Sequence, residues 1–491
     1  PMTFEPLWRM LRQASPLSGR DLYLSAALIA SYGAIVAFSG VHQYTLWKIF
    51  TKLLWKNATS RPPALIIMIL VGWSWVVRVC TAAGMDLELV LGGPCKAAAM
   101  GFSCAIVLAN LFMAVHLVHL IASEYPGVTW RPWLTTNVVL HVLFGCVIAI
   151  PHRFLHVESR SSLVRTAWES LIAPFAPVTF WHVIVADYAT SLAKAFADFQ
   201  LMACVSTSVF MRSARPGEPY VRTTVLWEEY HPQCVDSVFN PLMLALPFWV
   251  RLWQCLKVYS ITREQKNLWN ALKYCSAFPL IFMGWYRRSH PSDMANRLYL
   301  LSAVVNSSYT FIWDVLMDWG MLHWSMERGC WTLRMREQVL ISPKRSTYAV
   351  LMAFNFTLRF IWAMAVFGTV PTRGHGMFLF EAVEILRRTA WAAFRIEWEY
   401  VVKVLPKGVA VYASVEKDSV DGDEQSLLHH AQAEGLADSD NDSTTPVATL
   451  VKNSLKRASA SATTSPGSHS HPHLSARVER SNSDADSHLP L

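Results

Sequence analysis

Long apolar runs recur between residues 22 and 402 of the chain, separated by short polar segments. Each run is close to the twenty or so residues that a helix needs to cross a bilayer. The pattern predicts about ten transmembrane helices, at 22–43, 64–85, 97–122, 133–151, 176–210, 238–257, 267–286, 298–322, 347–370 and 376–402. The fifth run is too long for one straight span, so we expect it to tilt, kink or project beyond the bilayer.

The sequence therefore predicts an all-α integral membrane protein with four parts. We expect a cytosolic lead-in, a membrane region of four supporting helices, a second membrane domain with a six-helix core, and a disordered cytosolic tail. The tail is rich in Ser, Asp and His and has too few apolar residues to bury a core. In chain order, the four parts cover residues 1–21, 22–151, 152–412 and 413–491.

The composition supports a membrane protein. Hydrophobic residues make up 53% of the chain and charged residues 16%, whereas about a quarter of a soluble domain is charged. The net charge of +8 is spread along the chain, which indicates basic helix ends at a membrane surface and no nucleic-acid partner. No Walker A, HExxH or nucleophile-elbow motif occurs, so we expect neither enzymatic activity nor a cofactor.

Nine cysteines are scattered along the chain without a CxxC pair. Most lie inside apolar runs, where cysteine behaves as a small hydrophobic residue. The sequence thus predicts buried free thiols, with no metal site and no disulfide framework.

The orientation of the spans in the membrane is only weakly indicated. With both ends of the chain in the cytosol, the basic loop 323–346 would lie on the cytosolic face, as basic loops generally do, whereas the basic loop 44–63 argues against this orientation.

Charge is distributed unevenly between the predicted spans. The first four hold a single charged residue, Arg78, while the last six hold about a dozen. Each charge at the bilayer centre costs roughly 2.5–3.5 kcal/mol on the insertion scale, so such residues face a polar interior and mark function. The functional core is therefore predicted within 176–402, and the first four helices are expected to support it.

Two helical faces concentrate these charges. In the fifth span, Asp187, Ser191, Lys194 and Asp198 follow one another at helical spacing, with Thr190 beside them. A functional role is predicted for Asp187, whereas a buried structural ion pair is an open alternative for Lys194 and Asp198. In the tenth span, Glu384 lies three and four residues before Arg387 and Arg388, and Arg395 continues that face.

The charged set has a positive surplus. Its cations are Lys194, Arg251, Lys273, Arg359, Arg387, Arg388 and Arg395, and its acids are Asp187, Asp198, Asp314, Asp318 and Glu384. A purely structural set would tend to cancel, and the planar donors of arginine suit a tetrahedral oxyanion. The pattern favours anion transport; a proton relay through the acids is a competing interpretation.

Six segments in this region resemble the EXS family of phosphate exporters and related Golgi proteins: ADYATSLAKAFAD, PFWVRLWQCLKVY, NALKYCSAFP, VVNSSYTFIWDVLMDWG, LRFIW and LRRTAWAAFRIEWE. The resemblance makes 152–412 the expected EXS transport domain and implies that inorganic phosphate moves through a helical pathway. Trp362 resembles an aromatic gate, and Glu384 the acid that pairs with the arginines. The positions implied to contact phosphate are Asp187, Thr190, Arg251, Lys273, Arg359, Arg387 and Arg388.

About 21 residues precede the first predicted span, too few for the cytosolic SPX domain of the longer family members. The chain thus resembles the short branch, which implies a multi-pass protein of the Golgi membrane that returns phosphate from lumen to cytosol. It also implies a homodimer through the first four helices, and a link to Golgi glycosyltransferases or coat through the tail. The alternatives are a plasma-membrane phosphate exporter and a trafficking adaptor without transport.

Overall fold

The structure is a computed structural model that describes residues 60–92, 101–124, 132–149, 157–213, 223–327, 330–361 and 375–405. The predicted lead-in, the span at 22–43 and the tail lie outside the described residues. The helices, in chain order, are α4 (Arg61–Ala82), α5 (Leu87–Leu91), α6 (Gly101–Glu124), α7 (Pro132–Ala149), α8 (Val157–Leu171), α9 (Phe180–Ser191), α10 (Ala193–Ser213), α11 (Thr223–Asp236), α12 (Phe239–Thr262), α13 (Gln265–Cys275), α14 (Ala277–Ser289), α15 (Asp293–Trp313), a π-helical turn η3 (Asp314–Asp318), α16 (Arg345–Arg359) and α18 (His375–Lys403).

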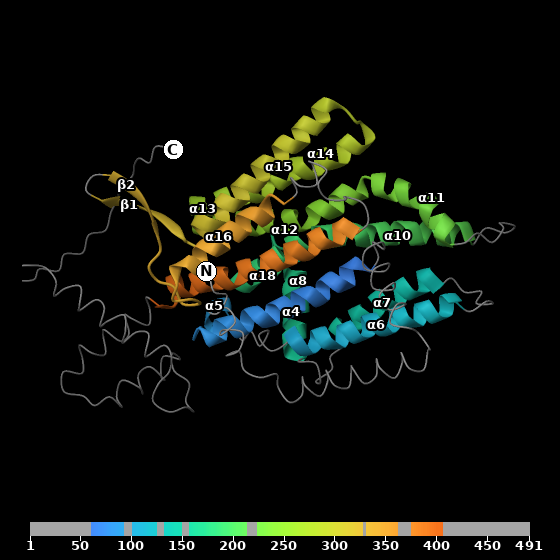
Figure 1. Ribbon diagram of the computed structural model, residues 1–491, viewed down its shortest axis with the longest axis horizontal. Coiled ribbons are helices and arrows are strands. Elements are labelled where there is room, and N and C mark those ends of the chain that lie inside the picture. Colours follow the sequence, from blue (N-terminus) through green and yellow to red (C-terminus); the bar gives the residue numbers. More distant parts are fainter. Residues whose placement is uncertain are drawn as a thin grey trace, which may run out of the picture. The chain divides into compact units, whose positions relative to one another are not determined.

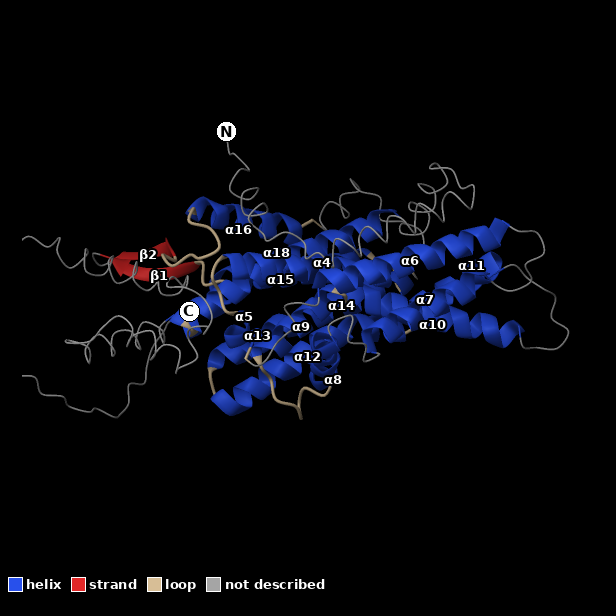
Figure 2. Cartoon of the chain, turned by 90° about the horizontal axis from the view of Figure 1, so that it is seen from below, coloured by secondary structure: helices blue, strands red, loops and turns tan. Residues whose placement is uncertain are grey.

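Helix α18 runs through the middle of the described helices (Figures 1 and 2). It has 29 residues and is therefore about 44 Å long. It packs against α4, α9 and α16. In Figure 1, α4, α6 and α7 lie on one side of it and α12 to α15 on the other. The helix that carries the densest charge in the sequence is thus central.

The contact between α4 and α18 depends on a glycine. A Cβ atom added at Gly72 would overlap the side chain of Thr389, whose Cγ2 would lie 3.1 Å away. The missing side chain lets the two backbones approach closely, as small residues do between membrane helices. Beside this contact, the largest buried apolar cluster includes Trp73, Tyr188 and Trp391.

Two predicted spans are broken helices. The run 176–210, which was expected to tilt, kink or project beyond the bilayer, divides into α9 and α10 at Leu192. The run 267–286 was predicted as one helix, but it divides into α13 and α14 at Ser276, and Lys273 lies in the last turn before the break. Broken helices at membrane depth are tolerated where neighbouring protein satisfies the freed backbone groups.

The all-α prediction needs one correction. A β-hairpin, β1 (Leu322–Glu327) paired antiparallel with β2 (Cys330–Met335), lies at one end of the described helices. The sequence indicates only a basic loop over most of this stretch. Helices α8 and α11 were also missed, because both are polar enough to fall below a transmembrane pattern.

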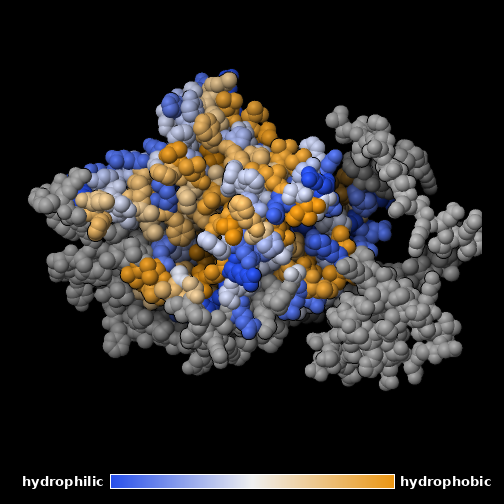
Figure 3. Space-filling view, turned by 180° about the vertical axis from the view of Figure 1, so that it is seen from behind, coloured by the Kyte–Doolittle hydropathy of each residue, from blue (hydrophilic) through white to orange (hydrophobic). Residues whose placement is uncertain are grey.

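Two described helical segments are long and apolar enough to cross a membrane, Arg61–Ala82 and Asp293–Asp318. The count of ten spans therefore stays a prediction. One reason for the difference is that α18 carries several interior charges, which lower its mean hydropathy. The outer surface still exposes large apolar side chains, including Trp249, Phe282 and Leu301, and hydrophobic patches cover much of the face in Figure 3. Such extensive apolar exposure is typical of a membrane-facing surface.

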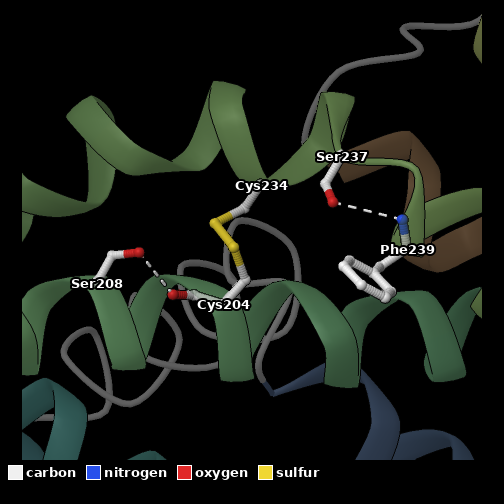
Figure 4. The surroundings of a disulfide bond; sticks show 5 residues. All are labelled: Cys204, Ser208, Cys234, Ser237 and Phe239. Atoms are coloured by element: carbon white, nitrogen blue, oxygen red, sulfur yellow. Dashed lines mark hydrogen bonds between the residues drawn. A yellow bond between two sulfur atoms is a disulfide. The ribbon is translucent and has the colours of Figure 1, made fainter.

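The prediction of free thiols is wrong for one pair of cysteines. Cys204 on α10 and Cys234 on α11 form a disulfide bond (Figure 4). The two helices are joined further along by Arg212, whose Nη1 donates to both carboxylate oxygens of Glu229 at 2.7 Å. Spacing alone did not reveal the pair, since 30 residues separate the two cysteines. Five further cysteines are free: Cys80, Cys104, Cys146, Cys255 and Cys275.

Candidate functional site

Asp187 of α9 is the centre of a buried polar network. Arg251 of α12 donates from Nε to Asp187 Oδ1 at 2.9 Å, and the hydroxyl of Tyr274 donates to the same oxygen at 2.7 Å. The Arg251 Nε also lies 3.0 Å from the Tyr274 hydroxyl oxygen, and Nη1 donates to Gln254. Asp187 therefore fixes a cation, and Tyr274, which the sequence analysis did not select, completes the network.

Lys273 is held loosely by comparison. Its Nζ lies 3.5 Å from Asp318 Oδ2, and it faces two aromatic rings, 4.5 Å from the centroid of Tyr274 and 5.5 Å from that of Trp313. Asp318 also lies 3.7 Å from Arg395. The Lys273 ammonium group therefore shares one carboxylate with Arg395 and otherwise contacts ring faces. Its N–H groups can still donate to another ligand.

Asp314 joins three helices. Its Oδ2 accepts from Arg359 Nη2 at 2.8 Å and from Asn355 Nδ2 at 3.1 Å. The Oδ1 of Asn355 in turn accepts from Arg387 Nη1 at 3.1 Å. In the sequence, Asn355 was noticeable only as a glycosylation sequon within a span, so its bridging role was missed. Asp314 begins the π-helical turn η3, a feature frequent at functional sites.

The two adjacent arginines of α18 have different partners. Arg387 forms a two-point pair with Glu384, at 2.8 Å from Nε and 2.7 Å from Nη2. Arg388 instead reaches α9, where Nε donates to Ser191 Oγ at 2.9 Å and Nη2 to Thr190 Oγ1 at 3.2 Å. The helical spacing predicted that Glu384 would reach both arginines, but it pairs only with the first.

Arg388 is 6% exposed and forms no ion pair with a carboxylate in the described part of the chain. Its guanidinium lies 4.6 Å from the centroid of the Trp391 ring. Around it, five cations face four carboxylates, and Arg359 and Glu384 among them are partly exposed. These nine residues are Arg251, Lys273, Arg359, Arg387, Arg388, Asp187, Asp314, Asp318 and Glu384. Leaving a buried charge uncompensated costs several kcal/mol, so this site favours an added anion.

The remaining residues of the predicted charged set pair with each other or with neighbours on their own helix. Lys194 pairs with Asp198 at 2.6 Å, as the structural interpretation expected, and Arg395 pairs with Glu399 at 2.8 Å. Trp362 lies outside the described residues. Within those residues, no group of three or more His, Cys, Asp or Glu side chains is placed to hold a metal ion.

A further buried carboxylate, Glu397, escaped the sequence analysis. It is fully buried, pairs with Arg336, and accepts from the backbone N–H groups of Leu340 and Ile341 at 2.6 and 2.8 Å. The hydroxyl of Tyr348 donates to it at 2.6 Å. Glu397 thereby ties the segment after the hairpin and the start of α16 to α18, the helix that carries the arginines.

Several known proteins are similar in sequence to this chain. The chain is 26% identical over 272 residues to "SPX and EXS domain-containing protein 1" of Dictyostelium discoideum, covering 54% of this chain and 28% of that protein. It is 24% identical over 382 residues to "Protein ERD1" of Saccharomyces cerevisiae, covering 72% of this chain and 96% of that protein. It is 25% identical over 310 residues to "Phosphate transporter PHO1 homolog 10" of Arabidopsis thaliana, covering 62% of this chain and 37% of that protein.

The chain thus spans about a quarter to a third of the two longer relatives but nearly all of the yeast protein. The model of the EXS family matches residues 58–401, a range that contains every buried charge described above. EXS proteins are membrane proteins, which agrees with the apolar outer surface of the described helices. On this match, the chain belongs to the EXS family.

Proposed function

We propose that this protein carries inorganic phosphate across the Golgi membrane, from the lumen to the cytosol. The observation that carries the proposal is the buried surplus of positive charge at Arg388, which binds two hydroxyl groups and no carboxylate among the described residues. A phosphate near Arg388 would supply the missing negative charge and accept charge-assisted hydrogen bonds from its guanidinium.

The surrounding groups suit a tetrahedral oxyanion. The Thr190 and Ser191 hydroxyls accept from Arg388 and donate to the Asp187 carbonyl oxygen and to Glu384 Oε1, which fixes the guanidinium in place. Lys273 offers an ammonium group whose nearest carboxylate, Asp318, lies 3.5 Å away. Glu384 and Asp314 keep Arg387 and Arg359 oriented by ion pairs. Such prepositioned side chains lower the cost of binding, while the acids keep the site from holding the anion too tightly to release it.

The relatives support the same substrate and location. The Arabidopsis relative is named as a phosphate transporter, and the match over nearly all of yeast ERD1 favours the short, Golgi-type branch. We further propose that the protein is a transporter and not an enzyme, and that it acts as a homodimer. Its tail would contact Golgi glycosyltransferases or coat proteins. These parts of the proposal rest on the family resemblance.

The test is uptake of radiolabelled phosphate into proteoliposomes that hold the purified protein. Arg388→Ala removes the uncompensated guanidinium, and Arg388→Lys keeps the charge without the planar donors. Arg297→Ala removes an exposed arginine and serves as the matched control. We expect saturable uptake by the wild type and the control, a loss of at least tenfold in Arg388→Ala, and partial activity in Arg388→Lys.

Monodisperse protein without uptake in any variant or at any pH would contradict transport and support the adaptor alternative. Uptake that Arg388→Ala leaves unchanged would contradict the assigned site. The compartment is tested separately, by locating the tagged protein at its native level. A plasma-membrane signal would support the exporter alternative.

A further inference from the structure

A second buried charge cluster lies where α4, α10 and α18 meet. Arg61, the first residue of α4, places Nη2 3.2 and 3.1 Å from the two oxygens of Asp198. Its Nη1 lies 3.4 Å from Glu381 Oε1, and Lys194 Nζ donates to Asp198 at 2.6 Å. Two cations thus face two carboxylates, and the cluster is neutral when all four are ionised.

Glu381 is the weakly bound member of this cluster. It is 7% exposed, its one described contact is the long bond from Arg61, and its Oε2 has no hydrogen-bond partner within the described residues. Asp198 Oδ2 also accepts no hydrogen bond from a described residue, but this carboxylate forms ion pairs with both cations, at 3.1 Å from Arg61 and 2.6 Å from Lys194. A buried carboxylate oxygen without a donor is costly, whereas a proton on that oxygen removes the charge and supplies a donor.

We propose that Glu381 binds a proton and couples proton binding to the movement of phosphate. This inference rests on the proposed function. The step is an acid–base reaction: a hydronium ion gives its proton to Glu381 Oε2, an O–H bond forms, and water is released. The reverse step returns the proton, so no oxidant or reductant is involved.

The charged groups facing Glu381 come from three helices. Arg61 faces it from α4, and Asp198 and Lys194 lie beyond on α10. His231 of α11 interacts electrostatically with these same three residues. On α18 itself, the next acid is Glu384, one turn away. None of these groups donates to Glu381 Oε2 in the structure.

The proton site and the phosphate site share the same helices. Glu381 precedes Glu384 by three residues on α18, and Lys194 follows Ser191 by three residues across the break between α9 and α10. Three residues of helix span about 4.5 Å. A proton on Glu381 changes the second cluster from neutral to positive, and charges act strongly over such a distance in a buried setting.

Proton and phosphate binding should therefore favour each other. Such coupling between sites is reciprocal and typically amounts to about a 5- to 150-fold change in affinity. We expect the apparent affinity for phosphate to rise by at least about fivefold when Glu381 becomes protonated. Glu381→Gln mimics the protonated shape permanently and should keep the high affinity at all pH values.

The first test measures phosphate uptake against pH in wild type, Glu381→Gln and the exposed control Glu264→Gln. Phosphate itself changes protonation over this range, but it does so equally for all three proteins, so the difference between them isolates the protein. We expect the wild type and the control to show the same dependence of uptake on pH. Glu381→Gln should keep only the part of this dependence that comes from the protonation of phosphate itself. Glu381→Asp keeps a titrating group and should keep a pH dependence with a shifted midpoint.

The second test does not require transport. Infrared difference spectroscopy of purified wild type detects the carbonyl band of a protonated carboxylic acid during a pH titration. We expect a band that Glu381→Gln lacks, and a midpoint that added phosphate moves to higher pH. A band unchanged in Glu381→Gln, a midpoint indifferent to phosphate, or identical pH profiles of uptake would overturn the inference.

The two tests also separate this inference from the proposed function. Absence of uptake by the wild type at every pH would contradict transport. The infrared titration would then still decide whether Glu381 binds a proton that phosphate influences.

Discussion

Replacing Glu397 with glutamine should loosen the attachment of α16 to α18. In the wild type this carboxylate accepts from four donors: Arg336, the N–H groups of Leu340 and Ile341, and the Tyr348 hydroxyl. Glutamine retains one carbonyl acceptor and turns an N–H₂ group toward donors. The substitution thus leaves a buried arginine without its counter-ion.

The size of the effect follows from these contacts. Breaking one partner of a buried ion pair typically costs about 3–5 kcal/mol, most of it the cost of the remaining unpaired charge. Each hydrogen bond to a charged group contributes about 1.5–3 kcal/mol, so the loss of two such bonds gives a similar total. We expect a destabilisation of about 4 kcal/mol, which lowers the apparent melting temperature by about 10 °C.

The assay is thermal unfolding of the detergent-purified protein, followed by tryptophan fluorescence and by retention of the monodisperse peak. Trp319 and Trp398 lie close to Arg336 and report on this region. Glu337→Gln, at an exposed neighbouring position, is the matched control and should unfold like the wild type. If both variants melt within about one degree of each other, the reasoning about Glu397 is wrong.

Two further predictions concern other parts of the molecule. Gly72→Ala should destabilise the protein by about 1–3 kcal/mol, because the new methyl group overlaps Thr389; Gly145→Ala, with open space around the added carbon, should be neutral or slightly stabilising in the same unfolding assay. Burial, and then the nearby Lys194 cation, lower the pKa of His231 below its ordinary value of 6.5. The folded protein thus binds this proton more weakly than the unfolded chain, and stability is lost as pH falls below 6.5. Thermal unfolding of His231→Gln at neutral and acidic pH should show a smaller acid loss than the wild type, and an equal loss would contradict the assignment.

Periodicity within one helix was enough to predict part of the site. Glu384 does pair with Arg387 three residues later, and Lys194 with Asp198 four residues later. These contacts follow from the 3.6-residue repeat, which fixes the face on which a side chain lies. The repeat also indicated the charged interior of α18.

Partners on different helices could not be predicted in this way. Arg388 reaches α9 although Glu384 is one turn away, because packing decides which neighbour its guanidinium meets. Arg61 was counted among the basic residues of a loop, yet it begins α4 and pairs with Asp198 across 137 residues. Asn355 and Glu397 carry ordinary local patterns, and their roles arise only when α16, η3 and α18 come together.

The disulfide between Cys204 and Cys234 also distinguishes the two ends of the molecule by their redox environment. Such bonds persist in oxidising compartments and are rare in the cytosol, so we expect the end where α10 meets α11 to face the lumenal or extracellular side. Glu381 is linked through Arg61 to Asp198 of α10, and Lys403 ends α18 about 33 Å further along the helix. On the proposed function, a phosphate ion that enters from the oxidising side would meet Lys194 before Lys273, so the disulfide marks the end of the protein at which phosphate would enter.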